Sequence, residues 1–161
     1  MMIAFFIAAA AFSSAWQFET ESDPLGQKVY VASVAPEAER PHVALRFLCG
    51  GVTGVVLQFN LGDVETDGPQ YSTDEPGEES VRFSFIEGNY DTNAKRAPIT
   101  DGLGTFEIKG SEAAFIAGLL RESDRVSVQR GDVSFSFPLD GANGAIGEVL
   151  STCPYKYVEE K

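Results

Sequence analysis

Short segments of β-branched and aromatic residues, each bounded by Gly, Pro or Asp, recur along this chain. They cover residues 28–34, 42–49, 53–61, 80–86 and 104–109, and two more, 125–129 and 133–137, flank the turn Arg130-Gly131-Asp132. Alternating side chains point to opposite faces of a β-strand. Short turns between neighbouring strands favour antiparallel pairing. The pattern therefore predicts mainly antiparallel β structure.

Two later segments have the spacing of helices. The first is predicted over 112–121 with Ser111 as its cap, and the second over 142–150. The apolar stripes are Phe115, Ile116, Leu119 and Leu120 in the first, and Ala142, Ala145, Ile146, Val149, Leu150 and Cys153 in the second. Strands that precede helices predict an α+β fold. We expect a two-sheet sandwich or a curled sheet, covered by two short helices.

The first fifteen residues have the composition of a secretory signal. They carry no charge, contain an apolar block over 3–12 and end in the small residues Ser13-Ser14-Ala15. The block is too short to span a bilayer, and small side chains suit a signal peptidase. We predict a signal peptide over 1–15, cleavage between Ala15 and Trp16, and a single exported domain over 16–161. A buried N-terminal helix is the alternative.

Export changes the interpretation of the two cysteines, Cys49 and Cys153. An even number of cysteines in an oxidising compartment indicates a disulfide. Alternation places Cys49 on the apolar face of its predicted strand, and helical spacing places Cys153 on the buried stripe of the last helix. The two sulfurs are therefore both expected to point inward. Two separate buried thiols are the alternative.

The net charge of −12, from 24 acids and 12 bases, argues against nucleic-acid binding, which needs clustered Lys and Arg. Seven of the acids fall between residues 62 and 79. Among them, Asp63, Glu65 and Asp67 have the alternate spacing of the first ligands in a calcium loop. Pro69 stands where such a loop supplies a backbone ligand. A solvated acidic loop is therefore the main interpretation, and calcium binding, small-molecule binding or docking to a basic partner are alternatives.

Catalytic motifs are sparse. His42 is the single histidine, at the start of a predicted strand, and no Gly-x-Ser-x-Gly motif or Cys-x-x-Cys pair accompanies it. A His-rich or Cys-rich zinc site is excluded by composition. Carboxylate pairs could serve a hydrolase, but with 24 acids such pairs are unspecific. We predict a non-enzymatic protein without a cofactor, and rank a carboxylate-based hydrolase below the binding functions.

Several scattered motifs resemble a known family. They are Asp23-Pro24-Leu25, Phe115-x-x-x-Leu119-x-x-Ser123-Asp124-x-Val126-x-Val128 and Phe137-x-Leu139-x-Gly141-Ala142-x-x-Ala145-Ile146-x-x-Val149-x-x-x-Cys153. The chain resembles the small periplasmic proteins associated with type VI secretion, the VasI or TagO group. It is also similar in outline to the invasion-associated locus B proteins.

The resemblance implies an exported, non-enzymatic accessory or interaction module with a protein partner, and it transfers no active-site residue. The long acidic segment and the middle strands depart from the family pattern. We therefore expect a disulfide-linked interaction module, periplasmic or secreted, that does not span a membrane after signal removal and whose partner is unassigned.

Overall fold

The computed structural model of the protein describes residues 15–38, 40, 43–50, 54–62, 77–97 and 104–153. The predicted signal block over 1–14, His42 and the calcium candidates Asp63, Glu65 and Asp67 lie outside the described residues. The strands are β1 (Gln17–Ser22), β2 (Lys28–Val34), β3 (Ala44–Gly50), β4 (Gly54–Asn60), β5 (Glu78–Phe85), β6 (Gly88–Arg96), β7 (Thr105–Lys109), β8 (Arg125–Arg130) and β9 (Val133–Pro138), and the helices are α1 (Ser111–Glu122) and α2 (Ala142–Thr152).

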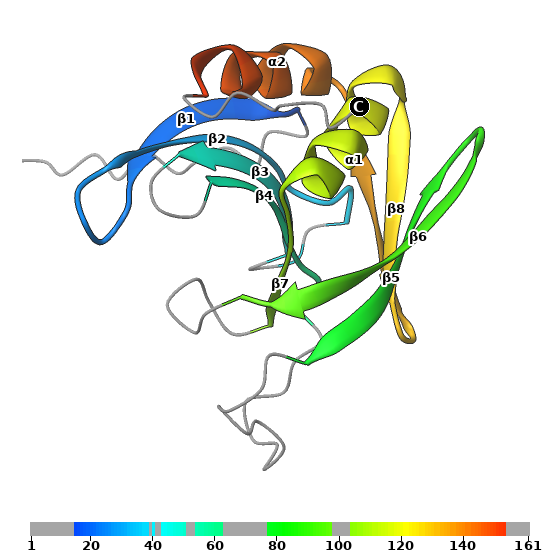
Figure 1. Cartoon of the computed structure of the whole chain (residues 1–161). Coiled ribbons are helices and arrows are strands. Elements are labelled where there is room, and N and C mark those ends of the chain that lie inside the picture. The colour runs from blue at the N-terminus through cyan, green and yellow to red at the C-terminus, as the bar shows by residue number, and fades with distance from the viewer. Residues whose placement is uncertain are drawn as a thin grey trace, which may run out of the picture.

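The described strands form one nine-stranded sheet in the order β1-β2-β3-β4-β7-β6-β5-β8-β9. Each pairing is antiparallel, and hairpins connect most neighbours (Figure 1). The predicted α+β class with mainly antiparallel strands is therefore confirmed. Of the two predicted layouts, the curled sheet is the one present, and no second sheet occurs among the described strands.

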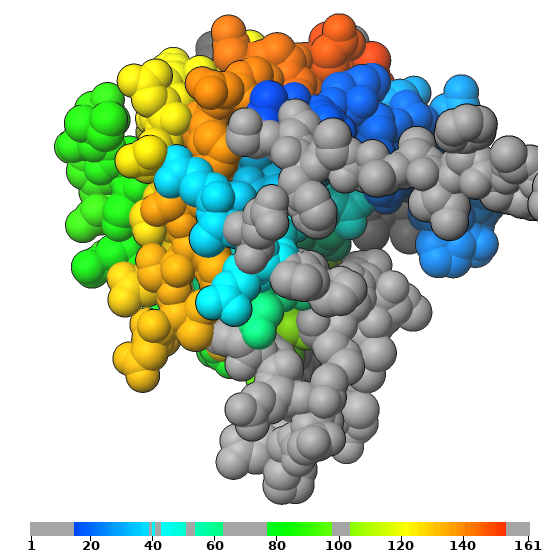
Figure 2. Space-filling view, turned by 180° about the vertical axis from the view of Figure 1, so that it is seen from behind, coloured from blue at the N-terminus to red at the C-terminus, as the bar shows by residue number. Residues whose placement is uncertain are grey.

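The sheet curls strongly, so that strands distant in the strand order face each other. Phe59 of β4 and Phe83 of β5 make an edge-to-face contact with ring centroids 6.1 Å apart, although β7 and β6 lie between their strands. At the far edge, the backbone N–H of Glu37 donates to the carbonyl oxygen of Ser136 at 3.0 Å. Figure 2 shows this segment after β2, in cyan, lying against β9 in orange. The curl therefore encloses a core on the inner face of the sheet.

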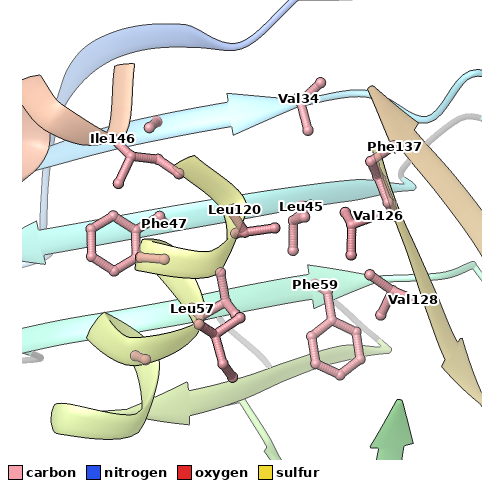
Figure 3. Close-up of a cluster of buried hydrophobic side chains, with 14 of the residues drawn as sticks. Val34, Leu45, Phe47, Leu57, Phe59, Leu120, Val126, Val128, Phe137 and Ile146 are labelled. Atoms are coloured by element: carbon pink, nitrogen blue, oxygen red, sulfur yellow. The ribbon is translucent and has the colours of Figure 1, made fainter. Parts of the chain in front are cut away.

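The core consists of the inward residues of the strands and one stripe of each helix (Figure 3). Leu45 and Phe47 of β3 pair with Phe59 and Leu57 of β4, and all four are buried. Leu120 of α1 and Ile146 of α2 pack over them, while Val126, Val128 and Phe137 close the core from the β8–β9 side. Fully burying side chains of this size contributes about 1.5–3 kcal/mol each.

Strands β2, β3 and β4 are buried on their second face as well as on the face toward the core. Val29, Val31, Leu48 and Val56 point away from the core and form a separate buried apolar cluster. Strands that are covered on both faces carry continuous apolar runs instead of strict alternation. This burial explains why 55–57 reads Val-Val-Leu without a polar residue between them.

The predicted disulfide is present. Cys49 at the end of β3 is bonded to Cys153, which directly follows α2, with Cα atoms 5.6 Å apart and a separation of 104 positions in sequence. In the chain-entropy model, closing a loop of this length stabilises the fold by about 4 to 5 kcal/mol. The bond therefore fixes the last helix to the inner face of the sheet.

Trp16 packs into the core and anchors the N-terminal end of the described chain. Its side chain is 5% exposed, its indole N–H donates to the carbonyl oxygen of Pro138 at 3.0 Å, and its backbone N–H donates to that of Asp140 at 2.9 Å. No helix among the described residues is long and apolar enough to cross a membrane.

Three sequence expectations were wrong in detail. β1 and β6 were not predicted, because both are polar strands that depend on pairing with β2 and β5. The cap of α1 is Gly110 and not Ser111, since the chain turns there with φ 73° directly after β7. Phe115 is 55% exposed, because α1 turns its small residues Ala113 and Ala117 toward the sheet instead.

Two glycines provide a matched test of this geometry. Gly50 has φ 129°, and a Cβ built on it would lie 2.4 Å from the carbonyl oxygen of Lys28, so Gly50→Ala must separate β2 from β3. We expect it to lower the free energy of unfolding by more than about 1 kcal/mol. In α1, nothing lies within 4 Å of a Cβ on Gly118. Gly118→Ala should therefore raise the stability by about 0.5–1 kcal/mol. Urea denaturation measures both, and a Gly50→Ala midpoint equal to wild type would contradict the close approach.

Candidate functional site

The β5–β6 hairpin projects from the body of the protein on the side away from β1 (Figure 1). Val81 and Phe83 face the core, while Arg82 and Ser84 face outward. The turn between the strands places Ile86 at the tip with 79% of its surface exposed. The hairpin is therefore anchored through its inner face and exposed on its outer face and at its tip.

The outer face of the hairpin carries a polar hollow of about 520 Å³. β5, β6 and the end of β8 supply its lining, which consists of Ser80, Val81, Arg82, Asp91, Thr92, Asn93, Gln129 and Gly131. The register explains this gathering, since Arg82 lies opposite Asp91 on one side and opposite Gln129 on the other. The hollow is wide open to solvent and presents both hydrogen-bond donors and acceptors.

Arg82 and Asp91 form a bidentate ion pair across the floor of this hollow. The guanidinium Nε and Nη2 atoms lie 2.6 Å and 3.1 Å from the two carboxylate oxygens. These hydrogen bonds and the opposite charge raise the pKa of Arg82, and the hydrogen bonds from Arg82 lower the pKa of Asp91. Both groups therefore stay charged, and their side chains hold a fixed orientation toward solvent.

The inner face of β6 meets the first turn of α1. The hydroxyl groups of Tyr90 and Thr92 both donate to Oε1 of Glu112, the former at 3.2 Å. Burial of the Tyr90 hydroxyl, together with the neighbouring Glu112 charge, raises the pKa of Tyr90. The Tyr90 ring also lies 5.3 Å from that of Phe115. An exposed aromatic pair beside a carboxylate therefore borders the hairpin on this side.

The base of the hairpin is held by an arginine and aromatic cluster. Arg130, at the end of β8, is only 10% exposed and forms an ion pair with Glu79 of β5. Its guanidinium lies 4.2 Å above the ring of Phe106 in β7, and Arg96 of β6 approaches the same ring at 5.9 Å. Arg130 begins the Arg-Gly-Asp turn of the predicted β8–β9 hairpin, so the first side chain of that tripeptide points inward.

These groups are suited to recognition of a polar surface. Arg82 offers donors, Asp91 and Asn93 offer acceptors, and the aromatic pair offers apolar area that is not covered by described residues. A carboxylate whose pKa is lowered stays ionised, and a tyrosine whose pKa is raised stays protonated near neutral pH. Asp91 therefore presents a hydrogen-bond acceptor and Tyr90 a hydroxyl group.

The site residues predicted from sequence lie elsewhere. Cys49 and Cys153 meet under α2, and Trp16 lies against the β9–α2 connection. In the part of the chain that the structure describes, no group of three or more His, Cys, Asp or Glu is placed to hold a metal. The calcium interpretation concerns Asp63, Glu65 and Asp67, outside that part.

Sequence reasoning missed the hairpin because β6 has almost no apolar residues. One signal was available, since Glu87-Gly88-Asn89 is a turn sequence and the residues after it alternate around Tyr90, Thr92 and Ala94.

The chain matches no protein-family model, no curated protein and no solved structure. The candidate site is therefore defined by its own geometry.

The ion pair across the hollow makes a direct prediction about titration. In the folded protein, the Asp91 carboxyl should titrate below the ordinary aspartate pKa of about 3.9. Because the folded pKa is depressed, the pair contributes stability above the unfolded value, which is lost as the pH falls through the folded value. Arg82→Gln should raise the Asp91 midpoint toward the ordinary value, as read by carbon NMR of the carboxyl group.

Lys95→Gln is the matched control, because Lys95 pairs with Glu78 at 3.6 Å and not with Asp91. It removes a single positive charge from the other strand of the same hairpin, β6, and should leave the Asp91 midpoint unchanged. Equal shifts in both variants would show that general charge, and not the bidentate contact, sets the pKa.

Proposed function

We propose that this chain is an exported, disulfide-linked interaction module that binds a protein partner through the β5–β6 hairpin. The Cys49–Cys153 bond carries the proposal, because it joins the sheet to the last helix with the only two cysteines of the sequence. Disulfides of this kind persist in oxidising compartments and are rare in the cytosol. The bond is an observation separate from the predicted signal sequence, and it supports the same proposal of export.

The position of Trp16 also supports cleavage before it. Its backbone nitrogen donates to the carbonyl oxygen of Asp140, and Gly141 lies against it so closely that a Cβ there would be 3.4 Å from the Trp16 carbonyl oxygen. After cleavage that nitrogen becomes the terminal ammonium group, which keeps its donors. The fold therefore accepts Trp16 as a first residue.

The hairpin supports the binding part of the proposal. Its base is fixed by Arg130, Glu79 and Phe106, while its outer face and tip are exposed. Arg82 in the polar hollow and, on the opposite face of the hairpin, the aromatic pair Tyr90 and Phe115 are of residue types that are enriched in protein-binding surfaces. The resemblance to the VasI or TagO group gives one context for such a partner, a periplasmic accessory role in type VI secretion.

The export part predicts a mature N-terminus and an oxidised pair of cysteines. Protein recovered from cells that express the full chain should begin at Trp16, by N-terminal sequencing of the periplasmic or extracellular fraction. Alkylation of the denatured, unreduced protein should label neither Cys49 nor Cys153, because both thiols are consumed in the bond. An intact Met1 together with two labelled thiols would contradict export.

The binding part predicts crosslinks that are confined to the hairpin. A photoreactive residue in place of Ile86, at the exposed tip, should give a protein adduct of higher mass in cells that make the protein. The same residue in place of Glu148, which is exposed on α2, should give none. Adducts of equal yield from both positions would indicate random collisions and would remove the hairpin as the binding face.

A further inference from the structure

β6 lies in the middle of the strand order, yet most of it is paired on one side only. It pairs with β5 along eight positions, from Gly88 opposite Phe85 to Lys95 opposite Glu78. Its pairing with β7 is limited to Lys95 and Arg96, followed by one further bond from Ala97 to Thr105. No described strand pairs with residues 88–94 on the β7 side. Figure 1 shows β6 beside β7 at one end and far from it at the hairpin tip.

The backbone groups along this edge can be assigned from the register. The N–H of Ala97 donates to Thr105 of the β7 side, and alternate residues of a strand direct their backbone groups to the same neighbour. The N–H and C=O groups of Asn89, Asp91 and Asn93 therefore point away from β5. Among the described residues, none of these three N–H groups has a backbone partner.

The pairing of β6 with β7 stops at Glu107, opposite Lys95, two residues before β7 itself ends. β7 ends at Lys109, and Gly110 turns with φ 73° while its N–H bonds to the carbonyl oxygen of Val55 in β4. The chain then continues as α1, whose Glu112 receives the hydroxyl groups of Tyr90 and Thr92. A helix thus lies against the inner face of β6, and no described strand continues along the edge of β6.

We propose that an extended, positively charged segment of the protein partner adds to the edge of β6 as a further strand. This inference rests on the proposed function and specifies how the hairpin binds. Added strands gain affinity from main-chain hydrogen bonds and specificity from alternate side chains. Residues 88–94 span about 20 Å at the rise of a β-strand, which is enough to pair with roughly six residues of a partner.

Charge and exposed apolar area indicate which kind of partner segment would pair with the edge of β6. Glu87 and Glu112 add two negative charges beside this edge. The bases Arg82 and Lys95 are each balanced by an acid, Asp91 and Glu78. The whole chain carries −12, so a basic segment is attracted and a second copy of this acidic chain is repelled. On the inner face, the partner's alternate side chains would meet Tyr90 and Phe115, of which Phe115 is 55% exposed.

The test uses a synthetic nine-residue peptide of alternating Lys and Val as the probe. Amide hydrogen exchange of the isotope-labelled full-length mature protein is followed by NMR with and without saturating peptide. We expect exchange at Asn89, Asp91 and Asn93 to slow at least tenfold with the peptide, because their N–H groups become donors to it. Tyr90 and Thr92, whose N–H groups face β5, should change little.

Two matched controls separate strand addition from charge attraction. The same peptide methylated at alternate backbone nitrogens keeps its charge but loses the donors, and it should give no protection. Asn93→Pro removes one of the three free N–H groups and blocks the edge with its ring, whereas Asn93→Ala removes the same side chain and keeps the N–H. Binding should fall at least tenfold in Asn93→Pro and stay within about twofold of wild type in Asn93→Ala.

Asn89→Pro serves as a second blocking variant should Asn93→Pro fail to fold, as judged by its amide spectrum. Protection by the methylated peptide, equal binding to both Asn93 variants, or protection confined to β1 would each overturn strand addition at β6. Absence of any protection at the three amides would overturn it as well. Hairpin crosslinks from Ile86 that persist alongside such a result would leave the proposed function standing.

Discussion

A column of three phenylalanine rings joins β4 and β7 to β5 across the interior of the curled sheet. Phe59 of β4 stacks on Phe106 of β7 at 5.8 Å and meets Phe83 of β5 edge-on at 6.1 Å. The first contact joins neighbouring strands, and the second crosses the interior of the curl. Aromatic pairs of this geometry add about 0.5–1.5 kcal/mol each beyond their burial. Because the second contact exists only when the sheet is curled, the core and the shape of the sheet depend on each other.

The same column determines which parts of the β5–β6 hairpin are held and which are exposed. Phe106 is covered by Arg130 and approached by Arg96, and both arginines contact Glu79 at the start of β5. These contacts with the core therefore hold the base of the hairpin in place. Toward the tip, packing fades, since Phe85 and Tyr90 are only partly buried and Ile86 is exposed. A surface with a fixed base and exposed strands suits recognition, because little order must be gained on binding.

The sequence predicted the parts of this fold that are defined by burial. β2, β3, β4, β5, β7 and both helices carry apolar periodicity, and the disulfide followed from the inward register of Cys49 and Cys153. β1 and β6 escaped prediction because their residues are mostly polar and their strand conformation comes from pairing with the neighbouring strands β2 and β5 and not from an apolar pattern of their own. The candidate site escaped for the same reason, since Arg82 meets Asp91 only once β6 is in register with β5.

Acidic side chains beside an unpaired strand edge affect which other strands can pair with it. Such an edge is a template for other strands, and natural proteins guard it with charge. Here Glu87 and Asp91 flank the edge of β6, and Glu19 and Glu21 lie on the outer strand β1, so two copies that approach edge to edge bring like charges together. The same acids attract a basic strand. In the proposed strand addition, net charge thus does not set the fold but discriminates between the strands that could pair with β6. It disfavours a second copy of this acidic chain and favours a basic segment.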